Sequence, residues 1–127
     1  LWRVVSRSDC VLCRRYGHHR AVHSAATHRS ASGPRQTLQR MLTNLKQIYL
    51  QRRHLEAALA CSDRLLLLAP DAPHELRDRG LLHHALECFG AARDDFERFL
   101  ALAPGDETAP RIEQMLAATR AKAEQIH

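Results

Sequence analysis

The chain has 127 residues, of which 45% are apolar and only 5% aromatic, enough for one small domain with a modest helical core and too few for a large enzyme. Its formal net charge is +5, but residues 1–38 hold seven arginines against one acid, while residues 39–127 hold 12 basic and 13 acidic residues. A basic arm on a nearly neutral body confines any binding of nucleic acid to the arm.

Residues 1–35 form a basic leader, and residues 14–36 show no helical or strand periodicity. A segment rich in Arg, His and Ser and almost free of acids, joined to a well-patterned domain, is typical of a shifted reading frame or a misplaced start. The chain also begins with Leu1 instead of Met. We therefore interpret the leader as disordered and non-native in origin.

The leader also admits other interpretations. Cys10 and Cys13, followed by His19 and His23, offer sulfur and imidazole ligands that suit zinc. Only five residues separate Cys13 from His19, however, whereas a zinc finger places about a dozen between its cysteine and histidine pairs. The same cysteine pair lacks the strand and helix context of a redox motif. A transit peptide, or an arm for nucleic acid or an acidic membrane, also stays open, although the leader has few aromatic rings for base stacking.

The four cysteines are too few and too scattered for a secreted disulfide framework, which favours a reducing cytoplasm. Cys61 and Cys88 fall in the periodic part of the chain and are expected to pack as small hydrophobes. No apolar run approaches the roughly 18 residues that a membrane-spanning helix needs. We therefore expect a cytoplasmic protein without a membrane partner.

The first predicted helix covers about residues 36–51. Apolar residues recur there at intervals of three and four and draw one stripe along the helix: Leu38, Met41, Leu42, Leu45, Ile48 and Tyr49. A second helix is predicted over about 55–69. Pro70 ends it, because proline cannot continue the helical hydrogen bonds.

A second pair of helices is predicted over about 73–86 and 90–102, closed by Pro104. Small residues mark the places where the helices of a pair approach closely: Ala57, Ala58, Ala91 and Ala92. Gly80 has the same role on the first helix of the second pair. The equivalent position in the first pair is Lys46, which we expect to loosen that contact or to extend its stem towards solvent.

The two pairs are copies of one repeat. Pro70 and Pro104 stand 34 residues apart, and each closes the phrase Leu-x-Leu-Ala-Pro. That period is the length of a tetratricopeptide repeat. We predict an all-α fold of antiparallel helix pairs, a short tetratricopeptide-type solenoid with repeats over about 39–72 and 73–106. A last helix over about 107–125 is the expected cap.

Four segments of the repeats carry a resemblance to a known family: 40–46, 48–50, 64–68 and 75–81, which read RMLTNLK, IYL, RLLLL and ELRDRGL. With them, residues 36–127 resemble the C-terminal tetratricopeptide part of a bacterial family described as regulators of sirC expression. In that family a transglutaminase-like domain precedes the repeats and carries any papain-like chemistry, and residues 1–35 do not match it. The resemblance therefore implies a fragment of a bacterial regulator without its catalytic domain.

Stacked helix pairs offer a surface to another protein and bring no chemistry, so we expect a protein–protein interaction module. Registering the repeats by their prolines places nine residues towards the groove lined by the first helix of each repeat: Arg40, Thr43, Gln47, Leu50, Gln51, His74, Arg77, Leu81 and His84. Arg40 and Arg77 suit an acidic peptide or a terminal carboxylate, with Leu50 and Leu81 as apolar anchors. The family's N-terminal domain is a further candidate partner.

The alternative function is the substrate-selecting part of a transglutaminase-like or peptidase-like enzyme whose catalytic domain is missing from this chain. The repeats hold no Gly-rich phosphate loop and no catalytic triad, and we expect neither a cofactor nor enzymatic activity. The neighbouring acids Asp94, Asp95 and Glu97 are expected on a solvated outer face. The adjacent His83 and His84 point to different sides of their helix, so we expect one to face the core.

Overall fold

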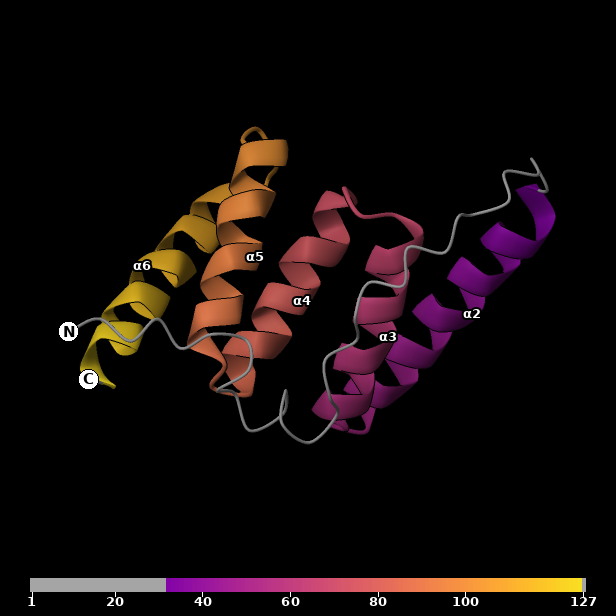
Figure 1. Cartoon of the computed structure of the whole chain (residues 1–127), viewed down its shortest axis with the longest axis horizontal. Helices are drawn as coiled ribbons and strands as arrows, with labels where there is room; N and C mark the ends of the chain where they lie inside the picture. The colour runs from indigo at the N-terminus through magenta and orange to yellow at the C-terminus, as the bar shows by residue number, and fades with distance from the viewer. Residues whose placement is uncertain (1–31, 127) are drawn as a thin grey trace.

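The computed structural model describes residues 32–126, which form helices joined by short turns, with no strand in this range. The helices are α2 (Ser32–Gln51), α3 (Leu55–Leu68), α4 (Pro73–Ala85), α5 (Phe89–Leu102) and α6 (Ala109–Gln125). They stand side by side in chain order, from α2 at one end of the row to α6 at the other (Figure 1). The predicted all-α fold of stacked helix pairs is confirmed. The zinc candidates Cys10, Cys13, His19 and His23 and the other expectations for residues 1–31 lie outside the described residues.

The observed helices agree with the predicted ranges to within a few residues. The largest difference is at the start, where α2 begins at Ser32 instead of about residue 36. Pro34 does not prevent this, because the amide groups of the first helical turn have no helical partner and a missing one costs nothing there. At the other end α6 begins at Ala109 instead of residue 107. Thr108 stays in the preceding turn, with its backbone N–H donating to the Asp106 carboxylate at 2.8 Å.

The turn inside each helix pair has the same backbone conformation. Arg53 and Glu87, 34 residues apart, have φ angles of 57° and 60° in the left-handed region that usually favours glycine. In each turn the backbone N–H of the next residue donates to the carbonyl five residues before it, at 2.9 Å in the first repeat and 2.8 Å in the second. The repeat that the prolines mark in the sequence is thus also a repeat of backbone geometry.

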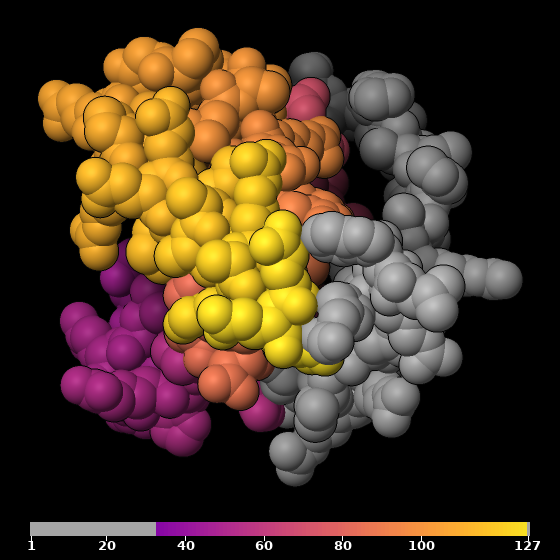
Figure 2. All heavy atoms as spheres, turned by 90° about the vertical axis from the view of Figure 1, so that its left-hand side faces the viewer, coloured from indigo at the N-terminus to yellow at the C-terminus, as the bar shows by residue number. Residues whose placement is uncertain are grey.

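The core consists of two clusters of buried side chains. One lies between the two helix pairs and comprises Ala58, Leu59, Leu82, Cys88 and Ala91. The other joins the second pair to α6 and comprises Leu66, Leu76, Ala92, Phe96, Phe99, Ile112 and Leu116. Seen from the α6 end of the row, α6 covers that end of the stack (Figure 2). This is the position expected of a cap, since Ile112 and Leu116 complete the second cluster.

Gly80 allows α4 and α5 to approach closely, as the sequence predicts. A Cβ atom at this position would lie 2.6 Å from the Cε1 atom of Phe96, closer than carbon atoms pack. Phe96 is fully buried and fills the space that a larger residue on α4 would need. Cys61 and Cys88 are both buried in the packing. None of the helices between residues 32 and 126 is long and apolar enough to cross a lipid bilayer.

Candidate partner-binding site

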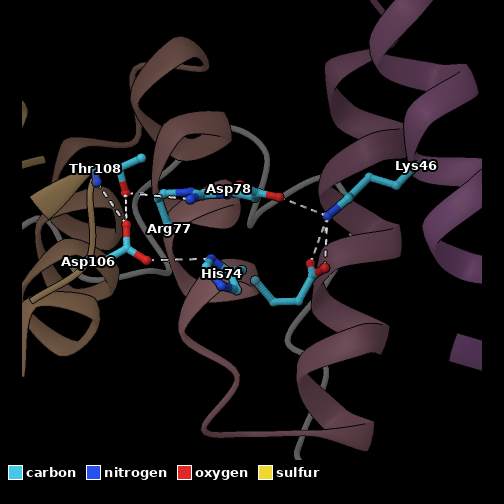
Figure 3. A network of polar contacts seen from close by, with 7 residues as sticks. Lys46, His74, Arg77, Asp78, Asp106 and Thr108 are labelled. Carbon is cyan, nitrogen blue, oxygen red and sulfur yellow. Dashed lines mark hydrogen bonds and ion pairs between the residues drawn. The ribbon is translucent and has the colours of Figure 1, made fainter. Parts of the chain in front are cut away.

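Lys46 joins the two repeats, which corrects the expectation that its stem would extend towards solvent. Lys46 is only 1% exposed. The Nζ atom donates to both carboxylate oxygens of Glu75 at 2.9 Å and to Oδ2 of Asp78 at 3.1 Å (Figure 3). The repeat places two acids of α4 opposite this position of α2, so the lysine is held inward by charge. A buried ionic contact therefore takes the place that the small residue Gly80 holds in the second repeat.

The electrostatic balance at Lys46 favours its charged form. Burial by itself lowers the pKa of the ammonium group, because it removes the charge from water. The hydrogen bond to Glu75 and the charge of Asp78 outweigh this effect, so the pKa of Lys46 is raised above its ordinary value. Lys46 is therefore positively charged at neutral pH.

A row of polar contacts continues from Asp78 to the turn before α6. Arg77 donates to Oδ1 of Asp78 from Nε at 3.2 Å and from Nη2 at 3.1 Å, and to the Thr108 hydroxyl from Nη1 at 3.5 Å. Thr108 in turn donates to Asp106, and its hydroxyl and backbone N–H lower the pKa of that carboxyl group. The Nδ1 atom of His74 lies 4.0 Å from Oδ2 of Asp106. One polar row thus crosses from α2 over α4 to the α5–α6 turn (Figure 3).

The predicted groove residues of α2 are mostly exposed. Arg40, Thr43, Gln47 and Gln51 are exposed, whereas Leu50 is half-buried. Leu50 packs against the cluster between the helix pairs, so part of its side chain serves the core. The Thr43 hydroxyl donates to the carbonyl of Gln39 at 2.8 Å, a bond within the helix. Arg40, Gln47 and Gln51 are therefore the predicted contacts on α2 whose long polar side chains reach solvent.

The predicted groove residues of α4 are more deeply set. His74 is exposed, whereas Arg77, Leu81 and His84 are half-buried. Leu81 packs against the second core cluster, and Arg77 is held by Asp78 and Thr108. The structure thus brings Arg77 and His74 together at the Asp106–Thr108 turn, a contact that spans from α4 to the start of the cap.

His84 lies at the contact between α4 and α6. Its Nδ1 atom is 3.0 Å from the hydroxyl of Thr119, and that hydroxyl donates to the carbonyl of Met115 at 2.6 Å. The ring nitrogen is therefore the donor in this pair, which fixes the tautomer of a neutral imidazole. Burial, and then the nearby charge of Lys122, lower the pKa of His84. This residue holds the cap in place as well as lying at the predicted groove.

Asp95 corrects the expectation that the acids of α5 lie on a solvated face. Asp94 and Glu97 are exposed, but Asp95 is only 2% exposed. Its carboxylate accepts from Nε and Nη2 of Arg79 at 2.8 and 2.7 Å, and Arg79 also donates to Asp63 at 3.0 Å. Burial lowers the pKa of Arg79, but the bonds to Asp95 more than offset this, so the pKa is raised. Three helices, α3, α4 and α5, are tied together by this second ionic contact.

The acids that hold the two repeats together, Glu75 and Asp78, were not predicted as contacts of Lys46. The signal was present, because Lys46 occupies a position that is glycine one repeat later, and Glu75 and Asp78 follow it at nearly one repeat length. The adjacent His83 and His84 did separate as predicted, with His83 buried. Within residues 32–126 no group of three or more His, Cys, Asp or Glu side chains is placed to hold a metal ion. What this surface offers chemically is a set of fixed charges and hydrogen-bonding groups.

Comparison with known proteins agrees with this geometry. The family model of the tetratricopeptide repeat matches residues 45–117. The protein SirB1 of Salmonella typhimurium is 35% identical over 77 residues, which is 61% of this chain and 29% of that protein. A UPF0162 protein of Vibrio cholerae is 37% identical over 70 residues, 55% of this chain and 26% of its own length.

The UPF0162 protein YchA of Escherichia coli K12 is 32% identical over 77 residues, again 61% of this chain and 29% of the relative. The chain thus spans less than a third of the length of these curated relatives. No solved structure matches it significantly. The resemblance predicted from segments 40–46, 48–50, 64–68 and 75–81 is confirmed for the repeat region.

Proposed function

We propose, since the chain belongs to the tetratricopeptide repeat family, that it binds a peptide or protein partner on the face formed by α2 and α4. Stacked helix pairs of this family act as interaction modules, because each pair adds a strip to one continuous surface. The observation that supports this face is the Lys46 bridge, which fixes α2 against α4 by three hydrogen bonds. A surface held in this way meets its partner without first having to be ordered.

The contacts proposed on this face divide into exposed and deeper groups. Arg40, Gln47 and His74 are exposed and meet the partner first. Leu50 and Leu81 are half-buried and supply the apolar contacts at the base of this face. A partner with an acidic side chain or a terminal carboxylate fits this arrangement, because Arg40 offers a charge-assisted hydrogen bond at the surface.

Arg77 is a proposed contact that is already bound to a carboxylate of this chain. A carboxylate that approached its guanidinium would compete with Asp78, which already accepts two hydrogen bonds from it. Asp78 also accepts from Lys46, so a partner at Arg77 acts directly on the bridge between the repeats. Binding on this face is therefore coupled to the contact that holds α2 on α4.

The relatives suggest the setting of this module. Because the chain spans less than a third of their length, we place the repeats within a larger bacterial regulatory protein of the same kind, located in the cytoplasm. The remainder of such a protein is one candidate partner. Residues 32–126 are assigned the recognition of a partner and no catalytic step.

Site-specific photo-crosslinking tests the proposed face. A photoreactive phenylalanine analogue is placed at Gln47 on α2, at His74 on α4, or at Ala101, an exposed control residue on α5. The full chain is then irradiated in the cells that encode it. We expect one partner to be captured from Gln47 and His74 and not from Ala101. Equal capture from all three positions, or capture only from Ala101, would overturn the assignment.

A substitution on the same face gives an independent check. Arg40→Glu with Gln47→Glu changes two exposed residues and leaves the core and the Lys46 bridge untouched. We expect this variant to fold normally by circular dichroism and to lose the crosslink formed from His74. Arg77 and Leu81 are less suitable for this purpose, because both also hold α4 in place.

A further inference from the structure

Four apolar side chains lie exposed in a line along α2. They are Leu38, Met41, Leu45 and Ile48, with 44%, 63%, 39% and 44% of their surface exposed. Their spacing of three, four and three residues places them on one side of the helix, and we call this set the outer stripe. α2 stands at the end of the row of helices, with α3 on its inner side (Figure 1). A contiguous exposed apolar stripe marks a surface that another element covers.

The second repeat shows which kind of element covers this side of the helix. One repeat length of 34 residues relates Met41, Leu45 and Ile48 of α2 to Glu75, Arg79 and Leu82 of α4. All three residues of α4 contact the preceding helix pair. Glu75 bonds to Lys46, Arg79 bonds to Asp63 of α3 as well as to Asp95 of α5, and Leu82 packs with Ala58 and Leu59 of α3. On α4 this side is therefore covered mainly by a helix, and the repeat predicts a helix on the equivalent side of α2.

The side chains of the outer stripe define the chemistry of what covers it. Where α4 has Glu75 and Arg79, which need a lysine and an aspartate opposite them, α2 has the apolar Met41 and Leu45. The covering element must therefore present apolar side chains at the centre of the contact. Apolar residues spaced at three and four along a helix meet this requirement.

The charge at the end of α2 indicates which charged residues the covering element carries on its flanks, that is, beside its apolar side chains. The helix contains no aspartate or glutamate, and the exposed charge next to the outer stripe is positive, at Arg52 just beyond the end of the helix. Arg52 follows Ile48 by four residues and so stands at the end of the outer stripe. An element with acidic flanks is attracted here, whereas a second copy of α2 would bring the arginines of two chains together.

We propose that the outer stripe docks an acidic amphipathic helix of a partner, in the position that α3 takes on α4. The apolar side of that helix covers Met41 and Leu45, and an acidic side chain pairs with Arg52. This surface is distinct from the face proposed above, because Arg40 and Gln47 lie on another side of α2. The two faces therefore give one short module two separate contacts.

A pair of synthetic helices tests this proposal with the full 127-residue chain. Both peptides carry leucine at alternating intervals of three and four, and one has glutamate and the other lysine on its flanks. Binding is followed by fluorescence anisotropy at low ionic strength. We expect the glutamate peptide to bind more tightly, by up to about fivefold, because one exposed ion pair with Arg52 is worth up to about 1 kcal/mol.

Variants of the chain locate the bound peptide. Met41→Glu with Ile48→Glu, at two exposed positions, should weaken the glutamate peptide by more than about tenfold, whereas Leu67→Glu on α3, at a residue 60% exposed, should leave its affinity unchanged. Arg52→Glu should reduce the preference for glutamate over lysine flanks. Circular dichroism confirms that each variant is folded.

Four results would overturn the proposal. The first is equal affinity for the two peptides, and the second is no binding of either peptide. The third is that the Arg40→Glu, Gln47→Glu variant loses binding while the Met41→Glu, Ile48→Glu variant keeps it. The fourth is that the chain sediments as a dimer and that Met41→Glu dissociates this dimer. The third result would move the peptide to the other face of α2. The fourth would show that a second copy of the chain covers the outer stripe.

Discussion

Replacing Lys46 by alanine separates two accounts of how the repeats are joined. If the position required only a small residue, as Gly80 does in the second repeat, Lys46→Ala would relieve crowding and leave the protein equally stable or more stable. The structure predicts the opposite result. Glu75 and Asp78 would lose the cation that lies 2.9 and 3.1 Å from them, and two carboxylates would face each other without compensation.

The size of the loss follows from burial and distance. At an effective dielectric constant of about 20, unit charges about 3 Å apart attract by about 5 kcal/mol, but taking the ions out of water cancels much of this. Removing one partner of a fully buried pair costs about 3–5 kcal/mol. Here the side chains of Glu75 and Asp78 are 18% and 28% exposed, so water can reach them in the variant. We therefore expect Lys46→Ala to cost about 2–3 kcal/mol.

Urea unfolding followed by circular dichroism at neutral pH measures this change. The raised pKa of Lys46 means that its contribution is fully present at and below the ordinary lysine value of 10.5, and is lost only as the pH rises through the raised value. Gln47→Ala, at the exposed neighbour, is the control and should shift stability by less than about 0.5 kcal/mol. An unchanged or higher unfolding midpoint for Lys46→Ala would refute the bridge. Glu75→Gln in the Lys46→Ala background should restore part of the loss.

Two further predictions concern the second repeat. Gly80→Ala should destabilise the protein by about 1–3 kcal/mol, because its Cβ would lie 2.6 Å from the buried ring of Phe96; an unchanged melting temperature would contradict this close contact. The lowered pKa of His84 means that the neutral ring contributes stability above the ordinary pKa of 6.5, and that this stability is lost as the pH falls from that value through the lowered one. His84→Gln keeps a donor for Thr119 and should flatten the decline in unfolding midpoint between neutral and mildly acidic pH, whereas parallel pH profiles for the two proteins would count against the assignment.

The helix order and the repeat could be predicted because they depend on local signals. Pro70 and Pro104 end their helices wherever they stand, and periodic leucines identify the buried side of a helix without knowledge of its neighbours. Gly80 could also be assigned, since a glycine inside a helix indicates a close approach. These signals are intrinsic to the backbone and to the periodicity of the helix.

The ionic contacts do not follow from the pattern of any single helix, because they depend on how far long side chains reach between helices. The pattern of α2 alone predicts that the Lys46 side chain extends towards solvent, whereas Glu75 and Asp78 of α4 hold it inside the protein. Asp95 was assigned to solvent with its neighbours, although Arg79 holds it in the core. Helical periodicity gives the direction of a side chain and not the partner at its end.

The residues of the candidate site were predicted from the alignment of the two repeats at their prolines, and the structure shows the hydrogen bonds that these residues make. The sequence placed Arg77 in the groove but did not show that Asp78 and Thr108 already hold its guanidinium. Leu38, Met41, Leu45 and Ile48 were placed on one apolar stripe with buried Leu42, yet these four are exposed. The apolar stripe is wider than the part of α2 that packs on α3, so Leu42 lies in the core and the other four residues lie at the surface.

Hydrogen exchange of the chain with and without its captured partner tests the central claim most directly. The claim is that a partner binds on the face shared by α2 and α4, across the Lys46 bridge. We predict slower amide exchange in peptides covering Arg40–Gln51 and His74–His84 when the partner is bound, with the exposed part of α5 around Ala101 unchanged. Protection confined to α3 and α5, or no protection in either repeat, would contradict the account.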